Sequence, residues 1–233
     1  TTDAEFALSS PADEGARRRA LAEYLTTPDN PLTWRSIVNR IWLHHMGRGI
    51  VDSPNDFGRM GMKPTHPELL DWLAHRFRER QSIKDLHRLI VMSSTYRQSS
   101  AFSTDMAAID DSNQYYSRMH RRKLRAEELR DAVLSVAGKL NPKVGGPSYQ
   151  DFKFMDDHTP KYQYHLHDEN DSESHRRSIY RFIARSQPHP FMTALDCADP
   201  SQMVPKRDET TTALQALALM NNPFMTAMSE HFA

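Results

Sequence analysis

The segment from Tyr164 to Asp168 carries the sharpest metal-binding pattern in the sequence. It reads Tyr-His-Leu-His-Asp, and in an extended backbone the spacing of His165 and His167 would place both imidazoles on one side. Imidazole and carboxylate groups bind divalent metals, so His165, His167 and Asp168 form a candidate metal site. The alternative is a set of solvated loop histidines, because two histidines leave the ligand count unfilled and the spacing fits no closed zinc motif.

Two carboxylates stand four residues apart in the periodic segment 124–140, which predicts a helix. Glu127 and Asp131 would then share a helix face, with Arg130 close by. They could act as a general acid/base pair or bind a hard metal ion. Like charges at this spacing cost about 0.2–0.5 kcal/mol, so a compensating cation is expected. The alternative is therefore a structural ion network with one or more nearby arginines: Arg122, Arg125 and Arg177.

A third polar set surrounds residues 47–64, where four glycines and two prolines predict a loop. Backbone amides and guanidinium groups in this loop could hold a sugar or an anion, or the loop could be a rigid turn whose aspartate caps neighbouring backbone. Residues 96–98 follow a predicted helix end and could line the same surface. The candidate binding residues are Arg40, His44, Arg48, Asp56, Tyr96, Arg97 and Arg130.

Two other histidines are expected to be structural. His45 follows the apolar stripe of Trp34 and Ile41, and His87 lies at helical spacing from Ile83 and Ile90. Apolar neighbours at this spacing indicate a buried helix face. We therefore expect both to be hydrogen-bonded core histidines rather than ligands.

The elements that must position these residues are mostly helices. Ser10-Pro11 and Asn30-Pro31 place an N-cap before a first-turn proline, and Ser82 is a further N-cap. A capping box is predicted at Thr65-His66-Pro67-Glu68. The expected fold is mainly α, with a small β element near 177–183, a long irregular loop around 141–175, and a last helix over 210–221. Residues 1–10 are expected to be a tail, followed by a single helical domain over 11–233.

Composition excludes several functions. Thirty basic residues balance thirty acidic ones, so no net field favours nucleic acid. The single cysteine, Cys197, permits neither an intrachain disulfide nor a CxxCH attachment, so we expect no haem bound by this chain. No stretch of about 18 apolar residues predicts a membrane span. The chain begins at Thr1 without a signal peptide, which predicts an excised or processed segment.

Several ordered blocks of the sequence belong together. They are NPLTWRSIVNRIWLHHMGRGIVDSPNDFG (30–58), THPELLDWLAHRF (65–77), SIKDLHRLIVMSSTYRQSS (82–100), LRAEELRDAVLSVAGKL (124–140), RRSIYRFIAR (176–185) and KRDETTTALQALALMNNPF (206–224). Over roughly residues 16–228 these blocks resemble a planctomycete-specific domain of unknown function, found C-terminal in large exported proteins that often carry a cytochrome-c-like domain. The resemblance implies export to the periplasm or cell surface and a neighbouring cytochrome-c-like domain as partner. It implies no catalytic residues, because the family has no established reaction.

Two functions remain open from the sequence. The first is an uncharacterised module of an exported multidomain protein that binds a glycan or a partner domain. The alternative is a hydrolase, with a possible divalent metal, acting on a polysaccharide or a related extracellular substrate. No GxSxG, Walker or HExxH motif is present, which favours the module. An enzyme requires several polar groups with displaced pKa values converging on one pocket, whereas a module requires a groove or an exposed apolar patch.

Overall fold

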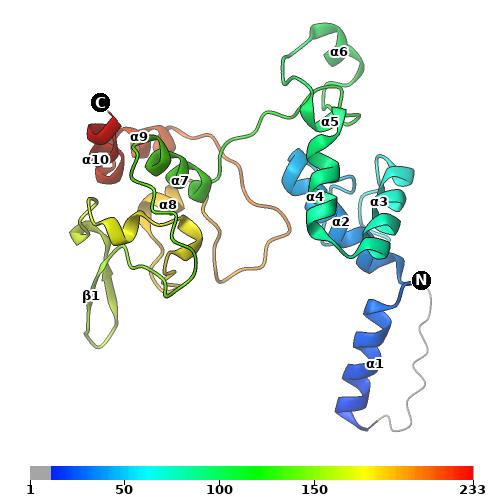
Figure 1. Cartoon of the computed structure of the whole chain (residues 1–233), viewed down its shortest axis with the longest axis horizontal. Helices are drawn as coiled ribbons and strands as arrows, with labels where there is room; N and C mark the ends of the chain where they lie inside the picture. Colours follow the sequence, from blue (N-terminus) through cyan, green and yellow to red (C-terminus); the bar gives the residue numbers. More distant parts are fainter. Residues whose placement is uncertain (1–11, 233) are drawn as a thin grey trace. The chain divides into compact units, whose positions relative to one another are not determined.

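The computed structural model describes residues 12–232, and the chain divides into two compact units at Arg122/Lys123 (Figure 1). The fold is mainly helical with one small antiparallel sheet, which confirms the predicted fold class. The sequence did not suggest this division, and the extent of the expected single domain, 11–233, stays a prediction. The predicted tail and the Ser10-Pro11 helix start lie outside the described residues.

The helices described in unit 1 are α1 (Glu14–Thr26), α2 (Pro31–Met46), α3 (Pro67–Arg80), α4 (Ile83–Met92), α5 (Ser94–Arg97) and α6 (Thr104–Ile109). Asn30 caps α2 through hydrogen bonds from the Leu32 and Thr33 amides, and Gly47 ends it in the left-handed conformation, as its position predicts. Ser82 caps α4 in the same way as Asn30, by accepting the Asp85 amide.

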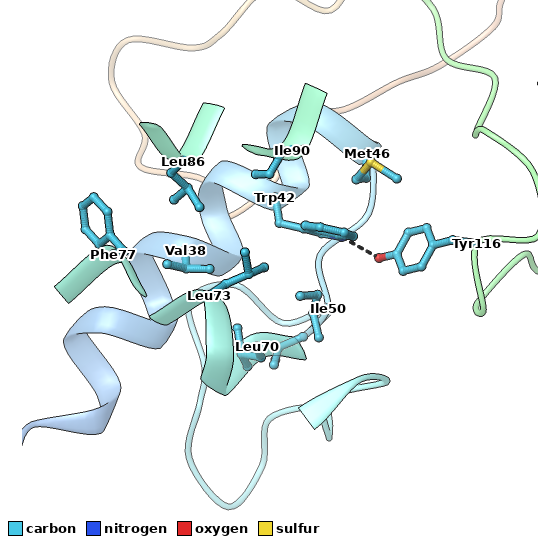
Figure 2. Packing of buried hydrophobic residues seen from close by; sticks show 11 residues of the cluster. Val38, Trp42, Met46, Ile50, Leu70, Leu73, Phe77, Leu86, Ile90 and Tyr116 are labelled. Carbon is cyan, nitrogen blue, oxygen red and sulfur yellow. Dashed lines mark hydrogen bonds between the residues drawn. The ribbon is translucent and has the colours of Figure 1, made fainter. Parts of the chain in front are cut away.

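The core of unit 1 lies where α2, α3 and α4 meet (Figure 2). Each helix contributes buried residues at i, i+3 or i+4 spacing, so that one face of each is apolar. Trp42 is buried among them, and its indole N–H donates to the hydroxyl of Tyr116 at 2.9 Å. The labelled core residues are Val38, Trp42, Met46, Ile50, Leu70, Leu73, Phe77, Leu86, Ile90 and Tyr116.

The predicted capping box at the start of α3 is wrong. His66 occupies the N-cap position, and its side chain makes no capping hydrogen bond. The Thr65 hydroxyl instead lies 3.3 Å from the carbonyl of Ile50 and 2.9 Å from Nδ1 of His66. Tertiary contacts with the preceding loop have therefore replaced the local cap.

Unit 2 contains α7 (Ala126–Val136), α8 (Pro190–Ala194), α9 (Ala213–Asn221) and α10 (Pro223–Phe232). Its core brings together Leu134 of α7, Phe191 and Met192 of α8, and Phe224 and Met228 of α10. The helix predicted over 210–221 corresponds to α9, but it is not the last one, because Pro223 begins α10, where its missing N–H costs nothing. Within the described residues, no helix is long and apolar enough to span a bilayer.

The strand predicted at 177–183 does not form at that position. That stretch forms a 3₁₀ turn, η3 (Ser178–Tyr180), beside an isolated bridge between Tyr149 and Arg181. The sheet is a hairpin inside the predicted loop instead, with β1 (Lys153–Met155) paired to β2 (Lys161–Gln163). Two further 3₁₀ turns follow it: η1 (Tyr164–Leu166) and η2 (Ser172–His175).

Two buried arginines hold the 141–176 segment in place. Arg130 of α7 donates to the carbonyls of Ser174 and Arg176 at 2.6 and 3.0 Å. Arg176 donates in turn to the carbonyls of Pro147 and Gly145. Each guanidinium donates to backbone carbonyls of an irregular segment. These hydrogen bonds let the segment pack against α7 without leaving those carbonyls unpaired.

A polar junction formed by Lys123, Asp196, Thr210 and Gln215 joins segments of unit 2 that are far apart in the sequence. The Asp196 carboxylate accepts from Lys123 Nζ at 2.7 Å, from the Thr210 amide at 2.8 Å and from Gln215 Nε2 at 3.0 Å. Burial alone would raise the pKa of Asp196, but these hydrogen bonds outweigh it and lower the pKa to about 2. We call this set the Asp196 junction.

Candidate functional site

A pocket of about 250 Å³ opens in unit 2 beside α8. Its walls come from three stretches of chain, within 181–185, 188–193 and 197–201, and from Tyr164. Guanidinium, imidazole, thiol, carboxylate and hydroxyl groups all line it. The volume lies just below the range of about 300–1,000 Å³ typical of sites for drug-sized molecules, so a smaller ligand fits.

Arg181 and His189 of the pocket wall share one buried carboxylate, that of Asp151. Asp151 Oδ2 lies 3.4 Å from Arg181 Nη1 and 3.7 Å from His189 Nε2. The side chains of Asp151 and Arg181 are only 7% and 6% exposed, so water screens their attraction weakly. Arg181 is therefore a fixed cation of the pocket wall.

His189 is held neutral. Burial lowers its pKa to about 4, although the Asp151 carboxylate acts in the opposite direction. Its Nδ1 caps α8 by accepting the Met192 amide at 3.4 Å, so the ring proton sits on Nε2 and faces Asp151. Neither ring nitrogen is left to take a proton from a ligand.

Arg185 differs from Arg181 because it is unpaired. It is exposed, lines the pocket, and has no hydrogen bond or ion pair to any residue that the structure describes. Tyr164 lies on the same pocket wall, and its hydroxyl donates to the carbonyl of Gln187 at 2.7 Å. The pocket therefore presents a free guanidinium together with a ring fixed by its own hydroxyl.

Cys197 lines the pocket as a protonated thiol. Burial raises the pKa of the Cys197 thiol, and the Glu127 carboxylate raises it further. The sulfur lies 3.7 Å from Glu127 Oε1, whose other oxygen is 3.0 Å from Arg207. A thiol is a poor nucleophile without its negative charge, so Cys197 is not activated for nucleophilic chemistry.

The two predicted catalytic carboxylates have different partners. Glu127 binds Arg207, and burial, which alone would raise its pKa, is outweighed by this partner so that the pKa falls. Asp131 accepts both the amide and the hydroxyl of Ser178 at 2.7 Å, with Arg177 3.8 Å away. Arg177 was among the cations expected for an ion network, and Arg207 was not. A structural role agrees with these contacts.

The His-x-His pattern does not lie in the extended segment that the predicted metal site required. Tyr164–Leu166 forms a 3₁₀ turn rather than an extended segment, so His165 is exposed while His167 is half-buried. Burial lowers the pKa of His167. In the described part of the chain, no three His, Cys, Asp or Glu side chains gather closely enough to hold a metal ion. Asp168 instead accepts the amide of Asn170.

The glycine-rich loop of unit 1 is a rigid turn in this structure. The buried Asn39 side chain pairs with both backbone polar groups of Val51 at 2.8 Å, and Asp56 caps the amide of Gly58 at 2.8 Å. A Cβ at Gly61 would meet the Asp56 carbonyl at 2.1 Å, so only glycine fits there.

The remaining predicted binding residues of unit 1 are dispersed. Arg40 donates to Asn55, and Arg48 faces Asp52 at 3.4 Å. Tyr96 packs edge-on against His45, while His44 and Arg97 are exposed. Arg130, the last of the predicted binding residues, belongs to unit 2.

A second group of titratable residues lies near Asp151. Burial raises the pKa of Glu169 to about 7, with Asp151 adding to the shift and Arg130 opposing it. Burial also raises the pKa of Tyr149 to about 12. Tyr149 Oη and Asp151 Oδ1 are buried and have no hydrogen-bond partner among the described residues. Both atoms could therefore still form a hydrogen bond to a ligand or to water.

The sequence patterns did not identify the residues that line the unit 2 pocket beside α8. Tyr164 lay in the segment interpreted as a metal motif and Arg181 in the predicted strand, while Arg185 and His189 carry no spacing signal. The one usable hint was His189-Pro190, an N-cap pattern that places the imidazole at a helix start.

One comparison with known proteins gives a result. The model of the family PSD1, protein of unknown function (DUF1553), matches residues 17–233. The chain belongs to this family. The match spans both units and confirms that the chain is a domain of unknown function, whereas its restriction to planctomycetes, its export and a cytochrome-c-like neighbour stay predictions. No curated protein and no solved structure matches the sequence. PSD1 membership brings no reaction with it, so function has to be argued from the pocket.

Proposed function

We propose that this PSD1 chain is a non-catalytic binding module of an exported protein, and that its unit 2 pocket holds one sugar unit of a glycan. The supporting observation is the pocket wall, where Arg181 is fixed by Asp151 and Arg185 is unpaired. Sugars present many hydroxyl groups, and guanidinium groups offer several donors in a fixed plane.

The pocket also suits a sugar in size and in its aromatic wall. About 250 Å³ accommodates a small ligand such as a single ring. The ring of Tyr164 is fixed by the hydroxyl bond to Gln187 and by packing against His189, with ring centroids 4.6 Å apart. A fixed aromatic ring gives apolar contact area at low entropic cost, and the C–H face of a sugar can use it.

Binding is favoured over catalysis because three groups of the pocket wall that could act in catalysis are already engaged. The Cys197 thiol is protonated, and both nitrogens of His189 are used. The Asp199 carboxylate accepts both the amide and the hydroxyl of Ser201, at 2.8 and 2.6 Å. The thiol, the imidazole and this carboxylate are therefore not available as nucleophile or base, whereas the guanidinium groups of the wall offer donors to a ligand.

The test is titration of the purified chain with neutral, uronate-containing and sulfated oligosaccharides by calorimetry. We expect Arg185→Ala to weaken the best ligand at least tenfold without changing thermal stability, since this side chain has no partner to lose. Lys139→Ala, an exposed charge of the same unit away from the pocket, is the matched control. Absence of binding to every oligosaccharide, or equal binding by Arg185→Ala, contradicts the proposal.

A hydrolase is the second candidate, and the displaced pKa of Glu169 favours it. A carboxyl with a pKa of about 7 is suited to general acid catalysis at neutral pH. Reducing-end release from the same oligosaccharides, abolished by Glu169→Gln, would support a hydrolase and contradict the non-catalytic module. Adding zinc or manganese to the assay tests the predicted metal dependence.

A partner domain is the other ligand that the module could bind. An apolar hollow of about 260 Å³ lies between α7 and α10, lined by Val133, Val136, Met228 and Phe232. A neighbouring cytochrome-c-like domain, as the family resemblance implies, is the partner we propose for it. Val136→Asp should then weaken binding of such a domain and leave glycan binding unchanged.

A further inference from the structure

His45 of α2 and His87 of α4 face each other at the surface of unit 1. Their nearest ring nitrogens, His45 Nε2 and His87 Nδ1, are 3.1 Å apart, and the ring centroids are 4.8 Å apart. Both histidines were expected to be hydrogen-bonded core residues. The hydrogen bond is present, but His87 is exposed and His45 only half-buried, so the pair is open to solvent.

The backbone decides which nitrogen of His45 carries the proton. His45 Nδ1 lies 2.9 Å from the carbonyl of Ile41, and a carbonyl can only accept. The proton is therefore on Nδ1, and the lone pair on Nε2 points toward His87. Metal-binding histidines typically show this arrangement, in which the ring nitrogen away from the metal donates to a backbone carbonyl.

The separation of the two nitrogens fits one shared ion. Two nitrogens bound to a tetrahedral zinc ion at about 2.0–2.1 Å are about 3.4 Å apart. The observed 3.1 Å is only a few tenths of an ångström shorter, and both rings must also turn so that their lone pairs converge on an ion beside the line between the two nitrogens. Without metal, the His87 Nδ1 proton lies between the rings, and an ion that binds both nitrogens would displace it.

We propose that His45 and His87 form a two-histidine site for a divalent ion of the zinc, nickel and copper class, with water completing the coordination. Imidazole is a preferred ligand of these ions. Two protein ligands are consistent with the absence of any three-residue cluster in the described chain. The ion would link α2 to α4, two of the three helices that build the core of unit 1.

Linking two helices of the folded state stabilises it, because an ion that prefers the native protein shifts the unfolding equilibrium. All three tryptophans, Trp34, Trp42 and Trp72, lie in unit 1. Tryptophan fluorescence therefore reports on the unit that would be stabilised. This inference is independent of the glycan pocket, which lies in unit 2.

The test uses the full chain, stripped with a chelator and then titrated with NiCl₂ or ZnCl₂. Calorimetry and thermal melting followed by tryptophan fluorescence should show one bound ion and a higher melting temperature. His87→Gln should weaken binding at least tenfold and remove the melting shift, while its melting temperature without metal stays near that of the wild type because residue 87 is exposed.

Two control variants separate this site from other histidines. His75→Gln changes an exposed histidine of α3 in the same unit and should retain the full effect. The double variant His165→Ala/His167→Ala tests the His-x-His segment of unit 2 and should also retain it. No binding by the wild type, or undiminished binding by His87→Gln, overturns the proposal.

Discussion

The Asp196 junction should account for a measurable part of the stability of unit 2. Asn at position 196 keeps the size and planarity of the side chain, and it tolerates the left-handed backbone at this residue, where φ is 62°. The change removes the negative charge that Lys123, Thr210 and Gln215 surround. Asp196→Asn therefore tests the charge with little change in shape.

The magnitude follows from the pKa. The surroundings lower the pKa of Asp196 from 3.8 to about 2, and each unit corresponds to about 1.4 kcal/mol. Full conversion gives about 2.4 kcal/mol, which we reduce to about 1–2 kcal/mol because the partner Lys123 is 32% exposed and partly screened. Because the folded-state pKa is the lower one, this stability is present above pH 3.8 and is lost as pH falls toward 2. About half should remain at pH 3.

Denaturant unfolding at pH 7, 5 and 3, followed by far-UV circular dichroism, measures the effect. The difference between wild type and Asp196→Asn should be largest at pH 7 and pH 5 and should shrink at pH 3. Asp208→Asn, an exposed aspartate of the same segment, is the matched control and should change little. A variant as stable as the wild type at pH 7, or a deficit that does not shrink at pH 3, would refute the reasoning.

Two further predictions concern one side chain in each unit. The pKa of His189 is about 4 in the folded state, against 6.5 when unperturbed. As pH falls, the unfolded state therefore takes up a proton on this side chain before the folded state does. The wild type should lose up to about 3 kcal/mol of stability between pH 6.5 and pH 4 for this reason. His189→Gln should flatten that loss in urea unfolding, and an unchanged pH slope would show that His189 is not its cause. In unit 1, Tyr116→Phe leaves the buried indole N–H of Trp42 without its acceptor, which should cost about 1–3 kcal/mol in unfolding followed by tryptophan fluorescence. Unfolding unchanged by this variant would show that the hydrogen bond contributes nothing.

The sequence could predict the elements whose signals are local. Asn30, Gly47 and Ser82 mark helix ends because capping depends on a few neighbouring residues, and α2, α4 and α7 formed where apolar periodicity predicted them. The same reasoning failed at Thr65, where a contact with Ile50, distant in sequence, replaced the local cap.

Only the tertiary structure decided the site. Asp151 comes from an irregular segment, Arg181 follows a 3₁₀ turn and His189 caps a helix, so no periodicity relates them. The pairing of Glu127 likewise depends on Arg207, which lies eighty residues away in the chain. The sequence determined which residues could do chemistry and which helices would form, because both depend on residue type and near neighbours. Which charges are paired, buried or left free depends on contacts between distant segments, and these exist only in the folded chain.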